Sequence, residues 1–99
     1  MYRRVITWTR PSADVKWPWE DQQSKVTIDD ILEAMDAADG FIAKTTVSET
    51  DLVLISNNDW VSKEHWSVYN NTSAVIALHD ALDSIVAQTN ITKTVTEVV

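Results

Sequence analysis

The sequence predicts one α+β domain, residues 1–99, whose strands and helices follow the order βαββαβ. Two observations carry this prediction. Four segments rich in β-branched residues alternate in polarity or are continuously apolar, and segments with apolar residues at helical spacing separate them. Residues typical of helix caps stand at the boundaries of the helical segments.

Residues 2–9 (YRRVITWT) predict the first strand, which ends before Pro11 because proline lacks the N–H that a strand ladder needs. Residues 11–25 have no sustained period, so we expect a loop with one helical turn after Pro18. Within this loop, residues 17–19 (WPW) either pack as a clasp over the edge of the core or act as a lid or docking segment.

The first helix is expected to begin at an N-cap, Thr27, with Asp30 at the third helical position, where a carboxylate faces free N–H groups. The only glycine, Gly40, stands where a left-handed residue ends a helix. The apolar stripe of this helix comprises Ile28, Ile31, Leu32 and Met35.

Residues 41–48 alternate in polarity, and residues 52–56 form a continuous apolar run that ends in serine. The turn residues between them, 49–51 (ETD), predict an antiparallel hairpin. The apolar run indicates a central strand that is covered on both faces.

Ser62 predicts the N-cap of a short helix that ends near Asn70. Thr72 or Ser73 then caps a longer helix over residues 74–88. The inward stripe of the longer helix comprises Val75, Leu78, His79, Leu82, Ile85 and Val86.

Asn90 can end that helix, and residues 91–99 alternate as a last strand. The complete order is that of a ferredoxin-like fold, a four-stranded antiparallel sheet with its helices on one face. The other face would carry apolar residues such as Val5 or Trp8, one side of residues 52–55, and Val95 or Thr94. Because a bare apolar face is a liability, we expect a homodimer whose sheets pack face to face.

Composition excludes several classes of function. The net charge of −7 repels phosphate backbones, so we expect no nucleic-acid partner, and the five tryptophans are expected to fill the core or an interface. The chain has no cysteine, which excludes disulfides and thiolate metal sites, and its two histidines are not spaced to share a metal. No stretch is apolar enough for a membrane span, and we expect a soluble, cytoplasmic protein without a metal site.

Residues 60–66 (WVSKEHW) resemble the W-x-S-x-E-x-W/F stretch that follows the third strand in the antibiotic biosynthesis monooxygenase-like family. The hairpin before this stretch resembles the same family in length and spacing. The resemblance covers residues 40–99 well and residues 1–39 through topology. It implies a dimeric α+β barrel with a pocket between sheet and helices, where an electron-rich substrate often reacts with oxygen without a cofactor.

In the haem-degrading branch of that family, the haem-ligating histidine matches His79 and a tryptophan matches Tyr69. An asparagine on the first strand of that branch has Thr7 as its nearest match. This resemblance implies haem as the alternative to our expectation that no cofactor is bound.

His79 and Tyr69 are therefore the candidate catalytic residues. Asp83 lies one helical turn after His79 and could fix its tautomer, which suits a general base or a ligand to a metal. The alternative is a histidine at the edge of the core, satisfied by Asp83 or a backbone carbonyl. Tyr69 could orient a carbonyl or phenol by a hydrogen bond, whereas His65 is expected to be solvated or interfacial. The candidate ligand-binding residues are Thr7, Trp8, Trp60, Trp66 and Asp83.

Two functions stay open at this point. One is a homodimeric barrel that is non-catalytic or binds a small aromatic ligand, a description that also fits an accessory protein of a virus or phage. The other is a cofactor-independent monooxygenase-like enzyme, or a haem-binding or haem-degrading one. A cavity beside His79 distinguishes them, because the oxygenase hypothesis fails if Trp66 and Met35 fill that space.

Overall fold

The computed structural model describes residues 1–99 and has the predicted βαββαβ order, with the second helix divided in two. The elements are β1 (Tyr2–Thr9), the 3-10 turn η1 (Pro18–Glu20), α1 (Gln22–Ala37), β2 (Phe41–Ser48), β3 (Val53–Trp60), α2 (Lys63–Asn70), α3 (Ser73–Thr89) and β4 (Thr92–Val98). The strands form one antiparallel sheet in the order β2-β3-β1-β4. This is the ferredoxin-like topology that the sequence predicted.

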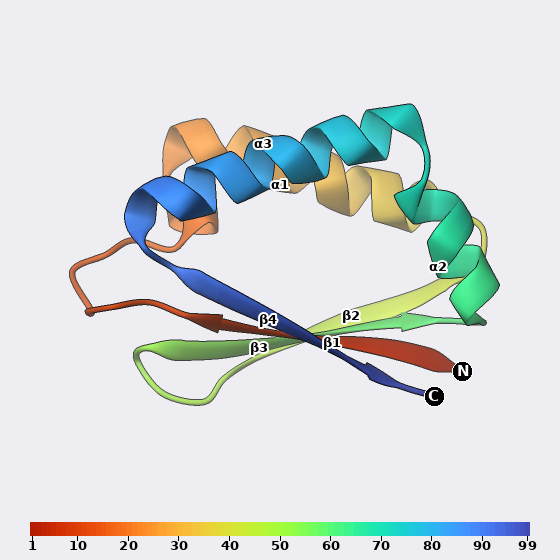
Figure 1. Ribbon diagram of the computed structural model, residues 1–99, viewed down its shortest axis with the longest axis horizontal. Helices are drawn as coiled ribbons and strands as arrows, with labels where there is room; N and C mark the ends of the chain where they lie inside the picture. Colours follow the sequence, from red (N-terminus) through yellow and green to blue (C-terminus); the bar gives the residue numbers. More distant parts are fainter.

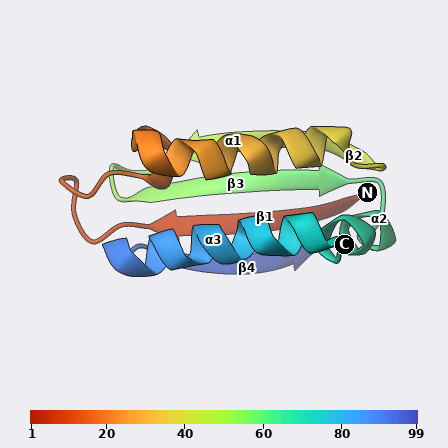
Figure 2. The same ribbon diagram turned by 90° about the horizontal axis from the view of Figure 1, so that it is seen from above.

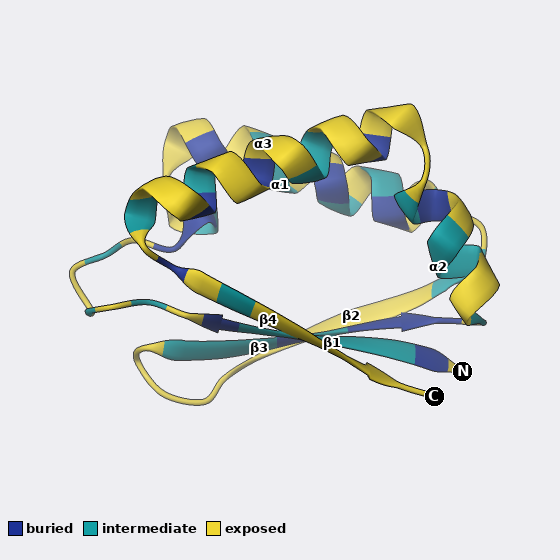
Figure 3. Cartoon of the chain, viewed as in Figure 1, coloured by how far each residue is buried: buried dark blue, intermediate teal, exposed yellow.

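Helices α1 and α3 lie side by side over one face of the sheet and leave the opposite face bare (Figure 1). Seen from above, α1 runs over the β2 and β3 half and α3 over the β1 and β4 half, while α2 lies at the end near the N-terminus (Figure 2). The inner sides of the helices are buried and their outer sides are exposed (Figure 3). None of the helices is long and apolar enough to cross a membrane.

The strand register places side chains from all four strands in rows on the face that the helices cover. The row at the end of β3 is aromatic and comprises Phe41, Trp60 and Tyr2. The next row is polar, with Lys44, Asn58, Arg4 and Glu97. The third comprises Thr46, Ser56, Ile6 and Val95, and the fourth Ser48, Leu54, Trp8 and Lys93. Because successive side chains alternate across a sheet, the residues between these rows face the bare side.

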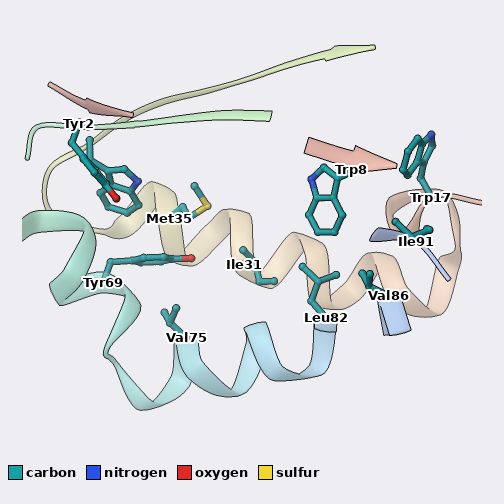
Figure 4. Close-up of a cluster of buried hydrophobic side chains, with 11 residues drawn as sticks. Tyr2, Trp8, Trp17, Ile31, Met35, Tyr69, Val75, Leu82, Val86 and Ile91 are labelled. Atoms are coloured by element: carbon teal, nitrogen blue, oxygen red, sulfur yellow. The ribbon is translucent and has the colours of Figure 1, made fainter. Parts of the chain in front are cut away.

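The core lies between the two layers. Met35 of α1 lies on the side of the strands, and Ile31 of α1 lies next to Leu82 of α3 (Figure 4). The buried hydrophobic residues are Tyr2, Trp8, Trp17, Ile31, Met35, Trp60, Tyr69, Val75, Leu82, Val86 and Ile91. Three of the five tryptophans are thus buried in the core, as their expected role requires.

Helix α1 begins earlier than the sequence pattern predicted. Its N-cap is Asp21, whose carboxylate accepts hydrogen bonds from Ser24 N (3.2 Å) and Ser24 Oγ (2.8 Å). Thr27 therefore lies inside the helix, and its prediction as the N-cap is wrong. Asp21 satisfies a free N–H group at the true helix start, and it follows η1 directly, so the loop is shorter than expected.

Strand β3 extends to Trp60, beyond the predicted end at Ser56, because residues up to Trp60 pair with both β1 and β2. Gly40 adopts the expected left-handed backbone, with φ of 83°, in the turn after α1. Helix α2 is capped by Ser62 as predicted, and Asn90, with φ of 60°, ends α3.

Candidate functional site

A cavity of about 770 Å³ lies between the sheet and the helices α1 and α3. Trp66 and Met35, which would have closed this space if they filled it, instead contribute to its lining, together with His79. The cavity that distinguishes the two functional hypotheses is therefore present beside His79.

Tyr69 of α2 and His79 of α3 meet at the wall of this cavity. Tyr69 Oη lies 3.3 Å from His79 Nε2, and the two rings are nearly perpendicular, at 88°. Burial lowers the pKa of His79 below its usual 6.5, assisted by the positive charge of Lys93. Burial also raises the pKa of Tyr69 to about 12. Both groups are therefore uncharged at neutral pH, so His79 can accept a proton and Tyr69 can donate a hydrogen bond.

Asp83 does not serve as the hydrogen-bond partner of His79. Its Oδ1 atom lies 3.0 Å from the Nζ atom of Lys93, which is near the start of β4. An ammonium group attracts a carboxylate more strongly than a neutral imidazole does, so Asp83 pairs with Lys93 and leaves His79 to Tyr69. Asp83 still lines the cavity, and its charge opposes the lowering of the His79 pKa.

Thr7 lies on the bare face of the sheet and does not line this cavity. Its neighbours Ile6 and Trp8 do line the cavity, and side chains alternate along a strand. Thr7 is instead in register with Ile55 and Thr94. The expectation that Thr7 belongs to the pocket between sheet and helices is therefore corrected.

Three buried polar atoms on β3 have no hydrogen-bond partner within the protein. They are Ser56 Oγ, Asn58 Oδ1 and Trp60 Nε1, and all three residues line the cavity. Their spacing of two residues places them on one face of the strand. Buried polar groups are nearly always paired, and each unpaired one costs about 1–3 kcal/mol, so a rearrangement that turns these enclosed atoms toward the cavity would let a bound molecule pair with them.

Trp60 was among the predicted site residues, but Ser56 and Asn58 were not. Asn58 lies beyond Ser56, the predicted end of the strand, and Ser56 closes an apolar run that indicated packing alone. Residues 56–59 (SNND) are polar at every position, so no alternation marks the rest of the strand, and Trp60, a residue type favoured in strands, is the one signal of its continuation.

Aromatic rings close the cavity at both ends. Near α2, the Arg4 guanidinium lies 4.0 Å from the centre of the Trp66 ring, and Trp60 lies 5.0 Å from Tyr69 between ring centres. At the far end, Trp8 packs edge-on against Trp19, with 6.0 Å between ring centres.

Trp19 in turn stacks on Trp17, with ring centres 5.2 Å apart and planes 11° apart. Trp17 is buried, and Trp19 contributes to the cavity lining. Residues 17–19 thus pack as a clasp at the end of the cavity, which is the first of the two roles considered for them.

The residues do not fit haem ligation as the haem-degrading branch implies it. Tyr69, with its Oη atom 3.3 Å from His79 Nε2, stands where that branch has a tryptophan, and Thr7, the nearest match to its asparagine, lies on the other side of the sheet. No group of three or more His, Cys, Asp or Glu side chains is arranged to hold a metal ion.

No family model matches the sequence, and no curated protein is similar to it in sequence. Solved structures are similar in fold. SnoaB, a cofactor-independent oxygenase from Streptomyces nogalater, matches with a TM-score of 0.71 and 13% identity over 99% of this chain and 90% of that chain. A candidate antibiotic biosynthesis monooxygenase from Deinococcus radiodurans matches with a TM-score of 0.68 and 13% identity over 100% and 91%.

A dimeric ferredoxin-like protein from an uncultured marine organism matches with a TM-score of 0.69 and 14% identity, over 100% of this chain and 93% of that chain. These similarities confirm the fold of antibiotic biosynthesis monooxygenase-like proteins that residues 60–66 predicted. At such low identities the similarity concerns the fold alone.

Proposed function

We propose that this protein binds a small aromatic molecule in the cavity between its sheet and its helices, and that it does so as a homodimer. The observation that carries the proposal is the line of three unpaired polar atoms on β3, from Ser56, Asn58 and Trp60. A ligand with oxygen substituents satisfies them once their side chains turn toward the cavity: Trp60 Nε1 donates to an oxygen, and Asn58 Oδ1 accepts from a hydroxyl group.

The size and walls of the cavity support an aromatic ligand. Its volume of about 770 Å³ lies within the range of about 300–1,000 Å³ that is usual for small-molecule sites. Rings of Trp8, Trp60, Trp66 and Tyr69 contribute to the lining and offer stacking and edge contacts. The few polar atoms among them would set the orientation of the ligand.

The bare face of the sheet supports the homodimer. Val47 and Val98 on this face are 55% and 54% exposed, and Val5 and Ile55 lie between them on the central strands. Packing two such faces together would remove this apolar surface from water. The dimeric ferredoxin-like neighbour is consistent with this assembly.

A second candidate function is cofactor-independent oxygenation, and the uncharged His79 beside Tyr69 favours it. In this reaction His79 Nε2 takes the proton of a phenol, and Tyr69 holds the phenolate oxygen. The phenolate ring passes electrons to molecular oxygen. One oxygen atom forms a new bond to ring carbon, the other leaves as water, and the phenol becomes a quinone.

Calorimetric titration with 1-naphthol tests the binding function. We expect saturable binding to the wild-type protein and binding about tenfold weaker for Asn58→Ala, which removes one polar contact of the usual strength. Asn57→Ala is the matched control, because Asn57 is the next residue on the same strand and faces the bare side. No saturable binding of 1-naphthol, or equal losses in the two variants, would overturn the proposal.

The oxygenase candidate has its own test. Oxygen uptake and the formation of 1,4-naphthoquinone from 1-naphthol are followed for the wild-type protein and for His79→Gln. Loss of a general base should lower the rate by about 10²–10⁴. A wild-type rate no higher than that without protein would exclude this activity toward 1-naphthol and leave the binding function standing.

A further inference from the structure

We infer that the cavity selects a negatively charged aromatic ligand, an aromatic carboxylate or phenolate, whose anionic oxygen pairs with Lys44. This inference rests on the ligand-binding function proposed above and names the chemical class of the ligand. Three independent features of the structure lead to it: the missing partner of Lys44, its place in the polar row, and the charge of the cavity lining.

Lys44 is the one cation of the cavity lining without an ion pair. Lys93 pairs with Asp83 at 3.0 Å, and Arg4 lies 3.7 Å from a carboxylate oxygen of Glu97. Arg4 also lies over the Trp66 ring and donates from Nη1 to Tyr2 Oη, so its charge already has a partner. None of the six ion pairs of the protein includes Lys44. Its ammonium group is free to bind an anion.

The register places Lys44 beside one of the unpaired polar atoms. Lys44 on β2 and Arg4 on β1 both lie directly across from Asn58 on β3, on the face that lines the cavity. The Cβ atoms of residues opposite one another in a sheet lie about 5 Å apart, a distance that a lysine stem can span. An anionic oxygen next to Lys44 therefore places an adjacent hydroxyl or ring substituent within reach of Asn58 Oδ1.

The cavity lining holds one cation that is not paired within a negative protein. Three of the eight Lys and Arg residues line it, Arg4, Lys44 and Lys93, but only two of the 15 Asp and Glu residues, Asp36 and Asp83. Because Asp83 pairs with Lys93 and Glu97 pairs with Arg4, Lys44 is the cation of the lining that no carboxylate neutralises, in a chain that carries −7 as a whole. A low-dielectric hollow strengthens this local field and favours an anion.

The surroundings of Lys44 give an anion further advantage. Lys44 is exposed and lines the cavity. The protein around its ammonium group takes away part of the hydration of that group and so lowers its pKa. A bound carboxylate replaces part of that lost hydration by a charged hydrogen bond. Asp36 on α1 is the one unpaired carboxylate of the lining, and it lies beyond ion-pair distance of Lys44.

Two probes of matched shape and different charge test the inference. We expect 1-naphthoate to bind the wild-type protein at least tenfold more tightly than 1-naphthamide in calorimetric titrations. Lys44→Met keeps the apolar stem and removes the charge, so it should abolish this preference, whereas Lys44→Arg should keep it. Lys25→Met is the matched control, because Lys25 is exposed on α1, takes part in none of the six ion pairs and does not line the cavity.

Titration with uncharged 1-naphthol separates failure of this inference from failure of the proposed function. If 1-naphthol binds while the wild-type protein shows no preference for 1-naphthoate, or Lys44→Met keeps that preference, the role of Lys44 is refuted and ligand binding stands. If none of the three naphthalene compounds binds, both proposals are refuted. Circular dichroism verifies that each variant is folded before it is titrated.

Discussion

Tyr69 Oη lies 3.3 Å from His79 Nε2, and this contact joins α2 to α3 at the wall of the cavity. The partner of His79 is thus an uncharged hydroxyl group and not the carboxylate of Asp83. An uncharged partner does not stabilise the imidazolium form, so burial dominates and His79 is uncharged at neutral pH. A ligand that enters the cavity can accept a hydrogen bond from Tyr69 Oη or donate one to His79 Nε2.

Tyr69→Phe tests the energetic value of this contact. The variant keeps the buried ring and removes only the hydroxyl group, so the free energy of unfolding should fall by about 1 kcal/mol, the usual value of one hydrogen bond. Urea unfolding followed by circular dichroism measures this change. The ring signals of His79 in proton NMR should also shift, because its partner is gone. Unchanged stability together with unchanged His79 signals would show that the contact does not persist in solution.

His79 should make the stability of the protein depend on pH. Because its pKa in the folded protein is lower than 6.5, the unfolded chain binds the proton more readily. The free energy of unfolding should therefore fall as the pH drops below about 6.5 and until the lowered pKa is reached. NMR titration should place the midpoint of His79 below that of an unstructured histidine. His79→Gln should lose this part of the pH dependence, and an unchanged profile in that variant would contradict the assignment.

Gly40→Ala should destabilise the turn between α1 and β2. Gly40 has φ of 83°, and a Cβ atom there would overlap the ring and Cβ of His65. The strained backbone alone costs about 1–3 kcal/mol, and the overlap adds to it. Urea unfolding of Gly40→Ala, His65→Gly and the double variant separates the two causes, because glycine at position 65 removes both the ring and the Cβ atom. The overlap makes the double variant more stable than the sum of the single changes predicts, and strict additivity would show that only the backbone matters.

Ile55→Glu should dissociate the proposed homodimer. Ile55 lies on the bare face of the central strand β3, between Thr7 and Val47, and a carboxylate there would be buried in the interface. Light scattering during size exclusion should give a dimer for the wild-type protein at micromolar concentration and a monomer for the variant. Val26→Glu is the control, because Val26 is 62% exposed on α1, away from that face. A monomeric wild-type protein would refute the face-to-face assembly.

Much of the fold follows from the sequence because short-range interactions decide it. Ser62 accepts a hydrogen bond from the backbone of His65, three residues away, and so marks the start of α2. The alternation of residues 2–9 and 41–48 likewise needs no distant partner to indicate a strand. Where two caps competed, as Asp21 and Thr27 did at α1, the local signals were ambiguous and the boundary was misplaced.

By itself, the sequence determined the order of the elements, the ferredoxin-like topology and the presence of His79 and Tyr69 on neighbouring helices. Only the tertiary structure decided which partner each functional group takes. The pairing of β1 and β2 with β3 places Thr7 on the bare face and Lys44 directly across from Asn58. Asp83 pairs with Lys93 and not with His79, and the packing of the helices on the sheet leaves a cavity beside His79. These outcomes depend on contacts between segments far apart in the sequence, whose energies no local pattern records.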